Sequence, residues 1–295
     1  MKSRSKDFWP VLAAAAGSTL VGSVPMLAMG LYSRGMDPQS MLFWRYWLAL
    51  SILVPLAVAT SPGLSAEWRS GGRGLFINGV TLGVLQTFTY FRAIQTMPSS
   101  IVVTIFFTYP LFAVLIDQVV FGRKARLPTV LAVLLILIGV ALTGWPHLAL
   151  HEVEPVGLAC AILTPLIFSV YIAIAFRFTR QSSPFAGATF IYLGLGCGFT
   201  LIVLALGLKM PGDWGGWARL VAIATVGGAL QISSFAYALP RLSASGYSII
   251  VSLELVTVTI LGVAVLGEDL TAVQIVGILL VIVGIIVERL LRRSD

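Results

Sequence analysis

Long runs of hydrophobic residues dominate the chain and set its predicted elements. A membrane-spanning helix needs about 20 mainly apolar residues to cross roughly 30 Å of hydrocarbon. Stretches such as VLAVLLILIGVAL are apolar on every side, which predicts helices rather than the alternating strands of a membrane barrel. The ten predicted spans are Trp9–Gly30, Gln39–Ala59, Gly74–Ile94, Ser100–Phe121, Leu127–Trp145, Pro155–Phe176, Phe185–Leu206, Gly215–Ala238, Ser243–Leu266 and Thr271–Glu288.

Two polar connections between these runs indicate an internal repeat. VVFGRKARLPTV begins at Val119 and AVLGEDLTAVQI begins at Ala264, so an offset of 145 residues aligns Gly122 with Gly267. Five spans precede the midpoint of the chain and five follow it, and an odd number reverses the second set in the membrane. We therefore expect two inverted five-helix repeats around a central cavity, residues 1–148 and 149–295. The first connection is basic, with Arg123, Lys124 and Arg126, and the second is acidic, with Glu268 and Asp269.

Composition supports the membrane class. Hydrophobic residues make up 58% of the chain and charged residues 11%, against about 25% charged in a typical soluble domain. The mean hydropathy of +0.98 is that of an all-α polytopic membrane protein. The connections are too short for a soluble catalytic or nucleotide-binding domain, and no cofactor is predicted. Cys160 and Cys197 fall inside spans, where we expect small packing residues rather than a disulfide framework.

The distribution of basic residues predicts the orientation. With the N-terminus in the cytoplasm, 14 of the 19 Lys and Arg residues lie on the cytoplasmic side, which predicts two cytoplasmic termini. The net charge of +7 then requires no nucleic-acid partner. The basic residues before the first span could also precede a cleaved signal peptide, but with nine further spans we expect this helix to be retained. The five basic residues on the outer side are Arg34, Arg45, Arg92, Lys209 and Arg219.

Three prolines inside the predicted spans are candidate helix breaks. Inverted-repeat transporters bind substrate near the bilayer midplane, beside interrupted helices. Pro25 and Pro165 lie within about two turns of each other under the repeat offset, and Pro110 lies in the middle of the fourth span. The alternative is that these prolines only shape helices, which membrane proteins tolerate.

Polar and aromatic residues deep in the spans are candidates for the cavity wall, because each is costly unless it faces a cavity or a partner. Gln86 and Gln231 are repeat partners, and Gln86 shares a helix face with Tyr90. The alternative for any single Ser or Thr is an ordinary interhelical hydrogen bond. The predicted substrate-binding residues are Gln86, Tyr90, Thr104, Phe107, Thr108, Tyr109, Pro110, Pro165, Gln231, Phe235, Tyr247, Ser248 and Ser252, with Tyr171 as a further candidate aromatic.

Glu254 is the acidic residue predicted nearest the centre of a span. A carboxyl group there either stays neutral or pairs with a cation, so it could couple transport to protons or bind a substrate ammonium. It could equally brace its helix. Asp117, Arg45 and Arg92 lie closer to span ends, where snorkelling explains them. His147 and His151 have no third ligand of matching quality nearby, and no metal site is expected.

Two segments resemble a known family. FGRKARLPTVLAVLLILIGVAL and SLELVTVTILGVAVLGEDLTAVQIVGILLVIVGII look like the two repeats of the drug/metabolite transporter superfamily, in its ten-helix EamA-type branch. Leu253-Glu254 resembles the closing-repeat signature, although the family usually has Pro where this chain has Leu255. The resemblance implies export from the bacterial cytoplasm across the inner membrane without ATP hydrolysis.

Within that branch the chain looks most like exporters of amino acids, including aromatic ones, and aromatic side chains would suit such substrates. Cationic-drug efflux and nucleotide-sugar transport are the alternatives within the same fold. An intramembrane enzyme is disfavoured, because no His lies in a predicted span and no paired acids face each other. The expected partners are a small-molecule substrate and the lipid bilayer, with no obligate protein partner.

Overall fold

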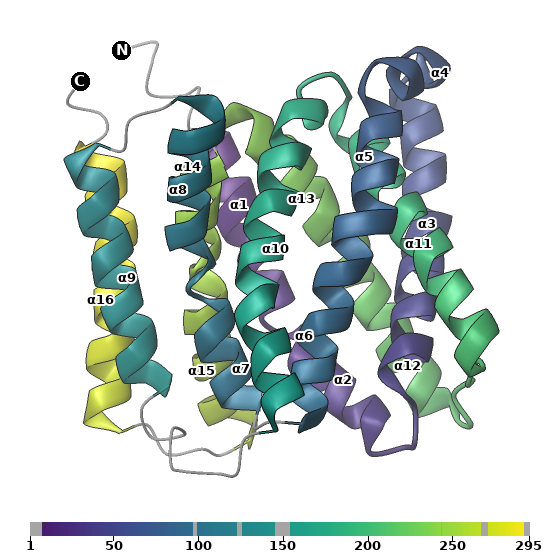
Figure 1. Ribbon diagram of the computed structural model, residues 1–295. Helices are drawn as coiled ribbons and strands as arrows, with labels where there is room; N and C mark the ends of the chain where they lie inside the picture. Colours follow the sequence, from purple (N-terminus) through teal and green to yellow (C-terminus); the bar gives the residue numbers. More distant parts are fainter. Residues whose placement is uncertain are drawn as a thin grey trace. The chain divides into compact units, whose positions relative to one another are not determined.

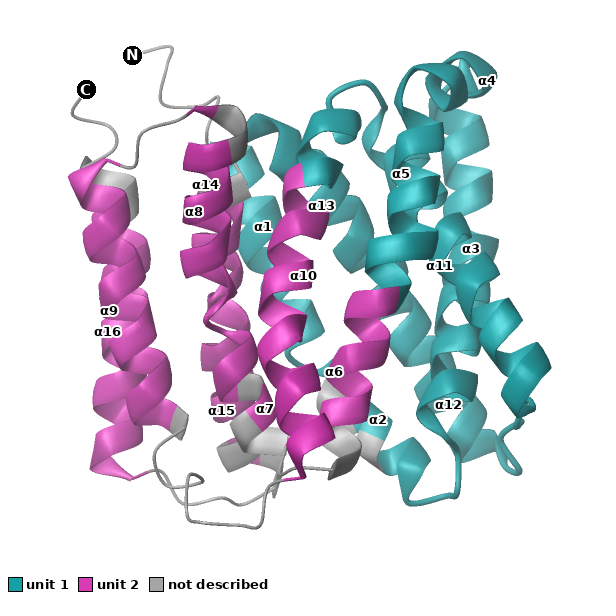
Figure 2. Cartoon of the chain, in the orientation of Figure 1, with its two compact units in different colours: residues 1–84, 174–242 teal, residues 85–173, 243–295 magenta. Residues whose placement is uncertain are grey.

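The computed structural model describes residues 8–96, 99–122, 126–144, 154–242, 244–266 and 271–291, and every regular element in these ranges is a helix. The chain divides into two compact units (Figure 2). Unit 1 comprises residues 1–84 and 174–242, and unit 2 comprises residues 85–173 and 243–295. Each unit therefore combines segments from both halves of the sequence. The predicted repeats, which divide at residue 148, are defined by matching one half of the sequence to the other. They are a different division from these units and stay a prediction.

Unit 1 contains two helices that begin at well-defined caps. The Asp37 carboxylate accepts a hydrogen bond from the Ser40 amide at 2.9 Å, directly before α3. The Asp213 carboxylate accepts one from the Gly216 amide at 2.6 Å, directly before α12. These side chains satisfy amides that a helix leaves free at its start. The elements of unit 1 are α1 (Phe8–Val21), α2 (Val24–Tyr32), α3 (Pro38–Thr60), α4 (Leu64–Glu67), η1 (Trp68–Gly72), α5 (Arg73–Asn78), η2 (Gly79–Gly83), the end of α10 (Pro155–Thr179), α11 (Pro184–Leu206), α12 (Trp214–Ala224), η4 (Thr225–Leu230), α13 (Gln231–Ala238) and η5 (Leu239–Arg241).

Helix α11 packs closely against η2 and α5 because glycines face the partner backbone on both sides. A Cβ added at Gly79 would lie 2.5 Å from the Ile191 carbonyl oxygen, and one at Gly194 would collide with the Phe76 carbonyl. Small residues that let backbones approach are typical of membrane helix interfaces. Gly79 and Gly194 therefore face each other's helix at the closest approach.

Unit 2 is organised around a second close helix pair, α9 and α16, which run alongside each other in Figure 1. A Cβ at Gly139 would lie 2.5 Å from the Gly277 carbonyl oxygen, and one at Gly277 would lie 2.6 Å from the Gly139 carbonyl oxygen. The elements of unit 2 are α6 (Val84–Thr96), α7 (Ser99–Phe106), α8 (Tyr109–Phe121), α9 (Leu127–Gly144), α10 up to Ala173, α14 (Ala244–Val251), α15 (Leu253–Leu266) and α16 (Ala272–Leu291).

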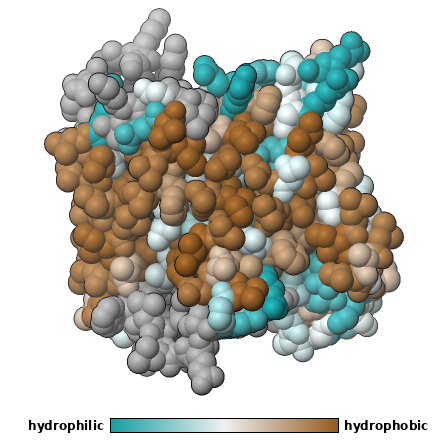
Figure 3. Space-filling view, in the orientation of Figure 1, coloured by the Kyte–Doolittle hydropathy of each residue, from teal (hydrophilic) through white to brown (hydrophobic). Residues whose placement is uncertain are grey.

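The helices carry exposed hydrophobic side chains along their lengths. On the face shown in Figure 3, hydrophobic residues cover most of the helix surfaces and hydrophilic ones gather near helix ends. Within the described residues, four helical segments are long and apolar enough to cross a membrane by themselves, namely Pro38–Thr60, Pro155–Thr179, Pro184–Leu206 and Trp214–Arg241. The predicted all-helical membrane class is therefore supported.

Several of the predicted spans are interrupted within the described residues. A turn at Gly22 and Ser23 separates α1 from α2, and Pro25 lies in the first turn of α2. A second turn, at Phe107 and Thr108, separates α7 from α8. A third, at Ser252, separates α14 from α15, and the π-helical segments η2 and η4 interrupt two further helices.

One expected helix break is absent. Helix α10 runs from Pro155 to Thr179 through Pro165 without interruption, so the prediction of a break at Pro165 is wrong. The physical reason is that a proline removes a single backbone donor, the partner of the carbonyl four residues earlier, and membrane helices tolerate this loss. Proline also leaves the rest of the helix intact, and the flanking hydroxyls follow the regular four-residue helical spacing: Ser169 donates to the Pro165 carbonyl at 2.7 Å and Thr164 to the Cys160 carbonyl at 2.8 Å.

Candidate functional site

The junction between α7 and α8 is the first part of the candidate site. The Thr108 amide bonds to the Ile105 carbonyl at 3.1 Å, three residues back instead of four, and its hydroxyl donates to the same carbonyl at 2.7 Å. Pro110 follows in the first turn of α8, where its missing N–H is tolerated. Figure 1 shows the helix giving way to a turn at this point. The junction turns Phe107 and Tyr109 inward, and both are almost completely buried.

Aromatic side chains gather beside this junction. The aromatic cluster consists of Tyr90, Phe106, Phe107, Tyr109, Phe168 and Tyr171. Its centre is Phe106, whose ring centroid lies 5.4 Å from that of Tyr90, 5.1 Å from Tyr109 and 5.2 Å from Phe168. Tyr109 meets Phe168 edge to face at 5.0 Å, and Phe168 stacks on Tyr171 at 6.1 Å. Such faces and edges can hold an aromatic or aliphatic group.

The junction between α14 and α15 lies next to the same cluster. The Ser252 amide bonds to the Ile249 carbonyl at 3.3 Å, which releases the Ser248 carbonyl from its regular helical partner. That carbonyl accepts instead from the Tyr109 hydroxyl at 3.0 Å and from the Ser252 hydroxyl at 3.3 Å. Ser248 and Ser252 are fully buried. One tyrosine therefore joins the two junctions, although 139 residues separate the bonded pair.

Glu254 lies in the first turn of α15, beside this junction. It is half-buried and within electrostatic range of Tyr109 and Tyr247. Position in the first turn favours an acidic side chain, because free amides and the helix dipole are positive there. An acid close to tyrosines and aromatic rings can bind a cation, so the arrangement suits an amphipathic molecule with a positive group.

The other predicted residues divide between the two units. In unit 2, Gln86 and Thr104 are half-buried and Pro165 is buried, and Gln86 accepts a hydrogen bond from the Thr87 hydroxyl at 3.4 Å. Gln231 and Phe235 belong to α13 of unit 1, where Phe235 is buried. Gln86 and Gln231 thus lie in separate units, and a shared wall of matched glutamines stays a prediction.

Sequence reasoning missed three residues of this region. Phe106 and Phe168 form the centre of the aromatic cluster, and the Ser169 hydroxyl donates to the Tyr109 carbonyl at 2.9 Å. One signal could have indicated them. Phe168, Ser169 and Tyr171 follow Pro165 within two turns of the same predicted helix. Membrane sequences are rich in such residues. Only the long-range contacts distinguish these three from residues that simply pack between helices.

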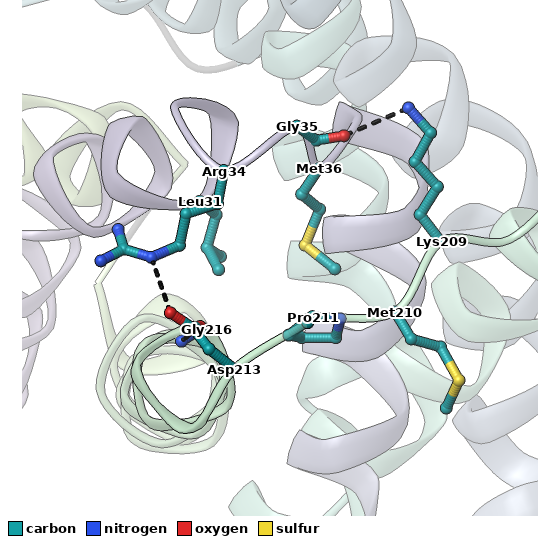
Figure 4. Close-up of a pocket in the computed structure, with 10 residues that line it drawn as sticks. Leu31, Arg34, Gly35, Met36, Lys209, Met210, Pro211, Asp213 and Gly216 are labelled. Atoms are coloured by element: carbon teal, nitrogen blue, oxygen red, sulfur yellow. Dashed lines mark hydrogen bonds and ion pairs between the residues drawn. The ribbon is translucent and has the colours of Figure 1, made fainter.

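A separate cavity of about 190 Å³ lies in unit 1 at the α2–α3 turn (Figure 4). Arg34 Nε lies 3.3 Å from Asp213 Oδ2, and the Lys209 ammonium lies 3.5 Å from Asp37 Oδ2 and donates to the Gly35 carbonyl at 3.1 Å. The Gly216 amide, and then Arg34, hold the pKa of the Asp213 carboxyl below its ordinary value. These charges are already paired and partly exposed, so we do not place the substrate here.

Two sets of predicted residues lie outside the described parts of the chain. They are the charged groups of the matched connections (Arg123, Lys124, Glu268 and Asp269) and the two histidines His147 and His151. The opposite charge of the two connections is therefore known from the sequence alone.

The class of the protein follows from these features. Apolar helices with exposed hydrophobic side chains indicate a multi-pass membrane protein, and interrupted helices are typical of transporters. A family model, described as the EamA-like transporter family, matches residues 8–145 and 155–288. The chain therefore belongs to the EamA-like transporter family of the drug/metabolite transporter superfamily, and the resemblance in the sequence is confirmed.

Individual relatives agree with the family. An uncharacterized transporter of Archaeoglobus fulgidus is 22% identical over 277 residues, which span 93% of this chain and 94% of the relative. A solved crystal structure with 17% identity matches 97% of this chain and 98% of its own, with a TM-score of 0.82. That likeness shows the fold alone.

Proposed function

We propose that the protein exports small metabolites from the cytoplasm across a bacterial inner membrane, and that its substrates are amino acids, aromatic ones included. It works by alternating access, with ten spanning helices in two inverted repeats, residues 1–148 and 149–295, and both termini in the cytoplasm. The observation that carries the substrate class is the aromatic cluster beside Glu254. Ring faces would hold the side chain of the substrate, and the carboxylate of Glu254 would hold its ammonium group.

Matching interruptions support the repeat. The offset of 145 residues places Phe107 on Ser252, so the two non-helical junctions of unit 2 correspond. The same offset places η2 (Gly79–Gly83) on residues 224–228, and η4 (Thr225–Leu230) begins one residue later. Corresponding helix breaks in the two halves of a transporter are the usual pointer to its binding site. Pro165 remains part of the proposed site through packing, since α10 continues through it.

The proposal is tested with purified protein in liposomes, by measuring movement of labelled phenylalanine with and without a pH gradient. Saturable movement, inhibited by other amino acids, is expected. Tyr90→Leu and Gln86→Ala should each lower the rate at unchanged protein level. Phe88→Leu, on the same helix but exposed, is the matched control and should transport normally. Normal transport by both site variants would remove Gln86 and Tyr90 from the site.

Efflux of cationic drugs is the second candidate, and the acid among aromatic rings is the observation that favours it. A fluorescent organic cation replaces phenylalanine in the same liposomes. Glu254→Gln should abolish its movement if the protein is a cation carrier, because the variant keeps the shape and removes the charge. Movement of the cation without movement of phenylalanine would overturn the amino-acid assignment.

A further inference from the structure

The cavity of unit 1 lies where long apolar helices begin and end. Arg34 lines it from the turn before α3, and Lys209 and Asp213 line it from the connection between α11 and α12 (Figure 4). Three of the four spanning segments found within the described residues start or finish beside it, namely Pro38–Thr60, Pro184–Leu206 and Trp214–Arg241. A spanning helix passes from hydrocarbon to water at its ends. The cavity therefore lies at the level of the lipid headgroups.

Tryptophans mark the same level. The Trp44 indole donates to the Lys209 carbonyl at 3.1 Å, and the rings of Trp44 and Trp217 meet edge to face with centroids 5.2 Å apart. The Trp214 side chain, at the start of α12, is almost fully exposed. Tryptophans gather at membrane–water interfaces, where their rings lie beside lipid headgroups. The surroundings of the cavity are therefore those of a headgroup region rather than of the bilayer midplane.

The charged side chains around the cavity carry an excess of positive charge. Asp213 pairs with Arg34 at 3.3 Å. Asp37 pairs with Lys209 at 3.5 Å. Arg219 also interacts electrostatically with Asp213 and supplies a third cation. Among the described residues of this region, the cations thus outnumber the two carboxylates, and a ligand with one negative charge would balance the excess.

Arg34 has hydrogen-bond donors left for such a ligand. Its Nε donates to Asp213 Oδ2 at 3.3 Å, and its Nη1 donates to the Gly30 carbonyl at 2.7 Å. A guanidinium has five N–H groups, of which these two bonds use two, and a phosphate can accept two N–H groups in parallel. The Arg34 side chain is also partly exposed. The contacts with Asp213 and Gly30 therefore hold the guanidinium in place and leave it able to bind an anion.

Exposed apolar side chains adjoin the cavity along the chain. Met210 lines the cavity and is largely exposed, and Leu204, Leu206 and Leu208 before it are exposed as well. A charged cavity beside an apolar surface fits a molecule that has a charged head and hydrocarbon chains. A small soluble anion would leave this surface unused.

We propose that this cavity binds the phosphate group of an anionic phospholipid, with Arg34 as the main donor and Lys209 as a second cation. The acyl chains lie along the exposed side of α11, and in the predicted orientation the lipid belongs to the outer leaflet. Basic pockets between membrane helices are known to bind anionic headgroups. The existing ion pairs disfavour a transported substrate here but not a headgroup, because the phosphate uses the remaining donors of Arg34. The inference is independent of which molecule the protein transports.

Native mass spectrometry of the purified full-length protein tests the inference. The protein in detergent is mixed with equal amounts of phosphatidylglycerol and phosphatidylcholine that have the same acyl chains. Phosphatidylglycerol should be retained about fivefold or more over phosphatidylcholine, the effect of one basic residue beside an anionic lipid. It should also raise the temperature of thermal unfolding, because a ligand of the folded state stabilises that state. Equal retention of the two lipids would overturn the inference.

Variants then assign the retained lipid to the cavity. Arg34→Gln and Lys209→Gln should each lower the preference for phosphatidylglycerol several-fold. Arg34→Lys should keep part of it, because it retains the charge but not the planar fork of donors. Arg241→Gln is the matched control for general attraction between basic residues and anionic lipid. This arginine lies at the far end of the spanning segment that begins at Trp214, and it donates to the Tyr237 carbonyl. It should keep the wild-type preference.

A soluble phosphate compound has the same binding chemistry, so it is tested separately. Glycerol 3-phosphate and inorganic phosphate should neither displace phosphatidylglycerol nor raise the unfolding temperature, because they lack acyl chains. Displacement by either would show a site for soluble phosphate and overturn the lipid assignment. Unchanged preference in both glutamine variants would also overturn it. If thermal unfolding shows that Arg34→Gln is misfolded, Arg34→Lys and Lys209→Gln decide, and wild-type preference in both refutes the inference.

Discussion

The two helix junctions of unit 2 occupy equivalent positions in the sequence repeat but are built differently. The α7–α8 junction contains Pro110, whose missing amide ends the regular hydrogen bonding locally. The α14–α15 junction has Leu255 at the equivalent position and no proline. It is stabilised by a long-range bond, in which the Tyr109 hydroxyl satisfies the Ser248 carbonyl. The same backbone break can therefore be imposed locally by a proline or from outside by a buried donor.

The largest effect is expected from Tyr109→Phe, which removes that donor and keeps the ring. The Ser248 carbonyl loses its 3.0 Å bond from the Tyr109 hydroxyl, so unfolding free energy should fall by about 1 to 2 kcal/mol. Transport should fall by roughly tenfold as the junction reverts toward continuous helix. Thermal unfolding and uptake measure the two effects. Tyr237→Phe, on α13, is the control, and equal losses in both variants would contradict a special role for Tyr109.

Pro110→Ala changes the α7–α8 junction and should affect transport more than stability. The new amide permits regular helical bonding across the turn, so stability should stay within about 1 kcal/mol of the wild type or rise. Transport should fall by roughly fivefold, because a continuous helix no longer turns Phe107 and Tyr109 inward. A stability loss as large as that of Tyr109→Phe would show that the proline acts through packing instead.

Leu255→Pro should have a smaller effect and provides the sharpest comparison. A proline at this position removes only the 3.2 Å bond from the Leu255 amide to Ser252, and the first turn of a helix tolerates proline. The single variant should lose less than about 1 kcal/mol. Combined with Tyr109→Phe it should restore part of the lost stability. Strictly additive losses in the double variant would refute the equivalence of proline and hydrogen bond.

The smallest effect is expected at Asp213, away from both junctions. Its variant is the reference against which the junction variants are compared. The pKa of this carboxyl is lowered in the folded protein by the Gly216 amide and Arg34. The stabilisation is therefore complete above the unfolded pKa of about 3.9 and is lost as the pH falls through the lower folded value. Asp213→Asn should flatten thermal stability in this acidic range and leave neutral transport unchanged. Junction variants should retain the wild-type acid dependence.

The candidate site was only partly predictable from sequence. Tyr109, Ser248, Ser252 and Glu254 were predicted because polar groups are rare and costly in a span. The bond between the Tyr109 hydroxyl and the Ser248 carbonyl was not predicted, and neither was the central position of Phe106. The break expected at Pro165 was wrong, because a membrane helix tolerates the single backbone bond that a proline removes and α10 continues through it. Whether a proline breaks a helix depends on the surroundings of the helix rather than on residue type.

Sequence by itself determined the membrane class, the all-helical character and the family, because hydropathy over about 20 residues is a local property of the chain. Tertiary structure decided how the irregular backbone is satisfied. Arg45 donates to Gly227 across 182 residues, and Tyr109 donates to Ser248 across 139. In the absence of water, a polar group must find its partner inside the protein. Which partner it finds is set by packing of distant helices, and no local pattern in the chain records it.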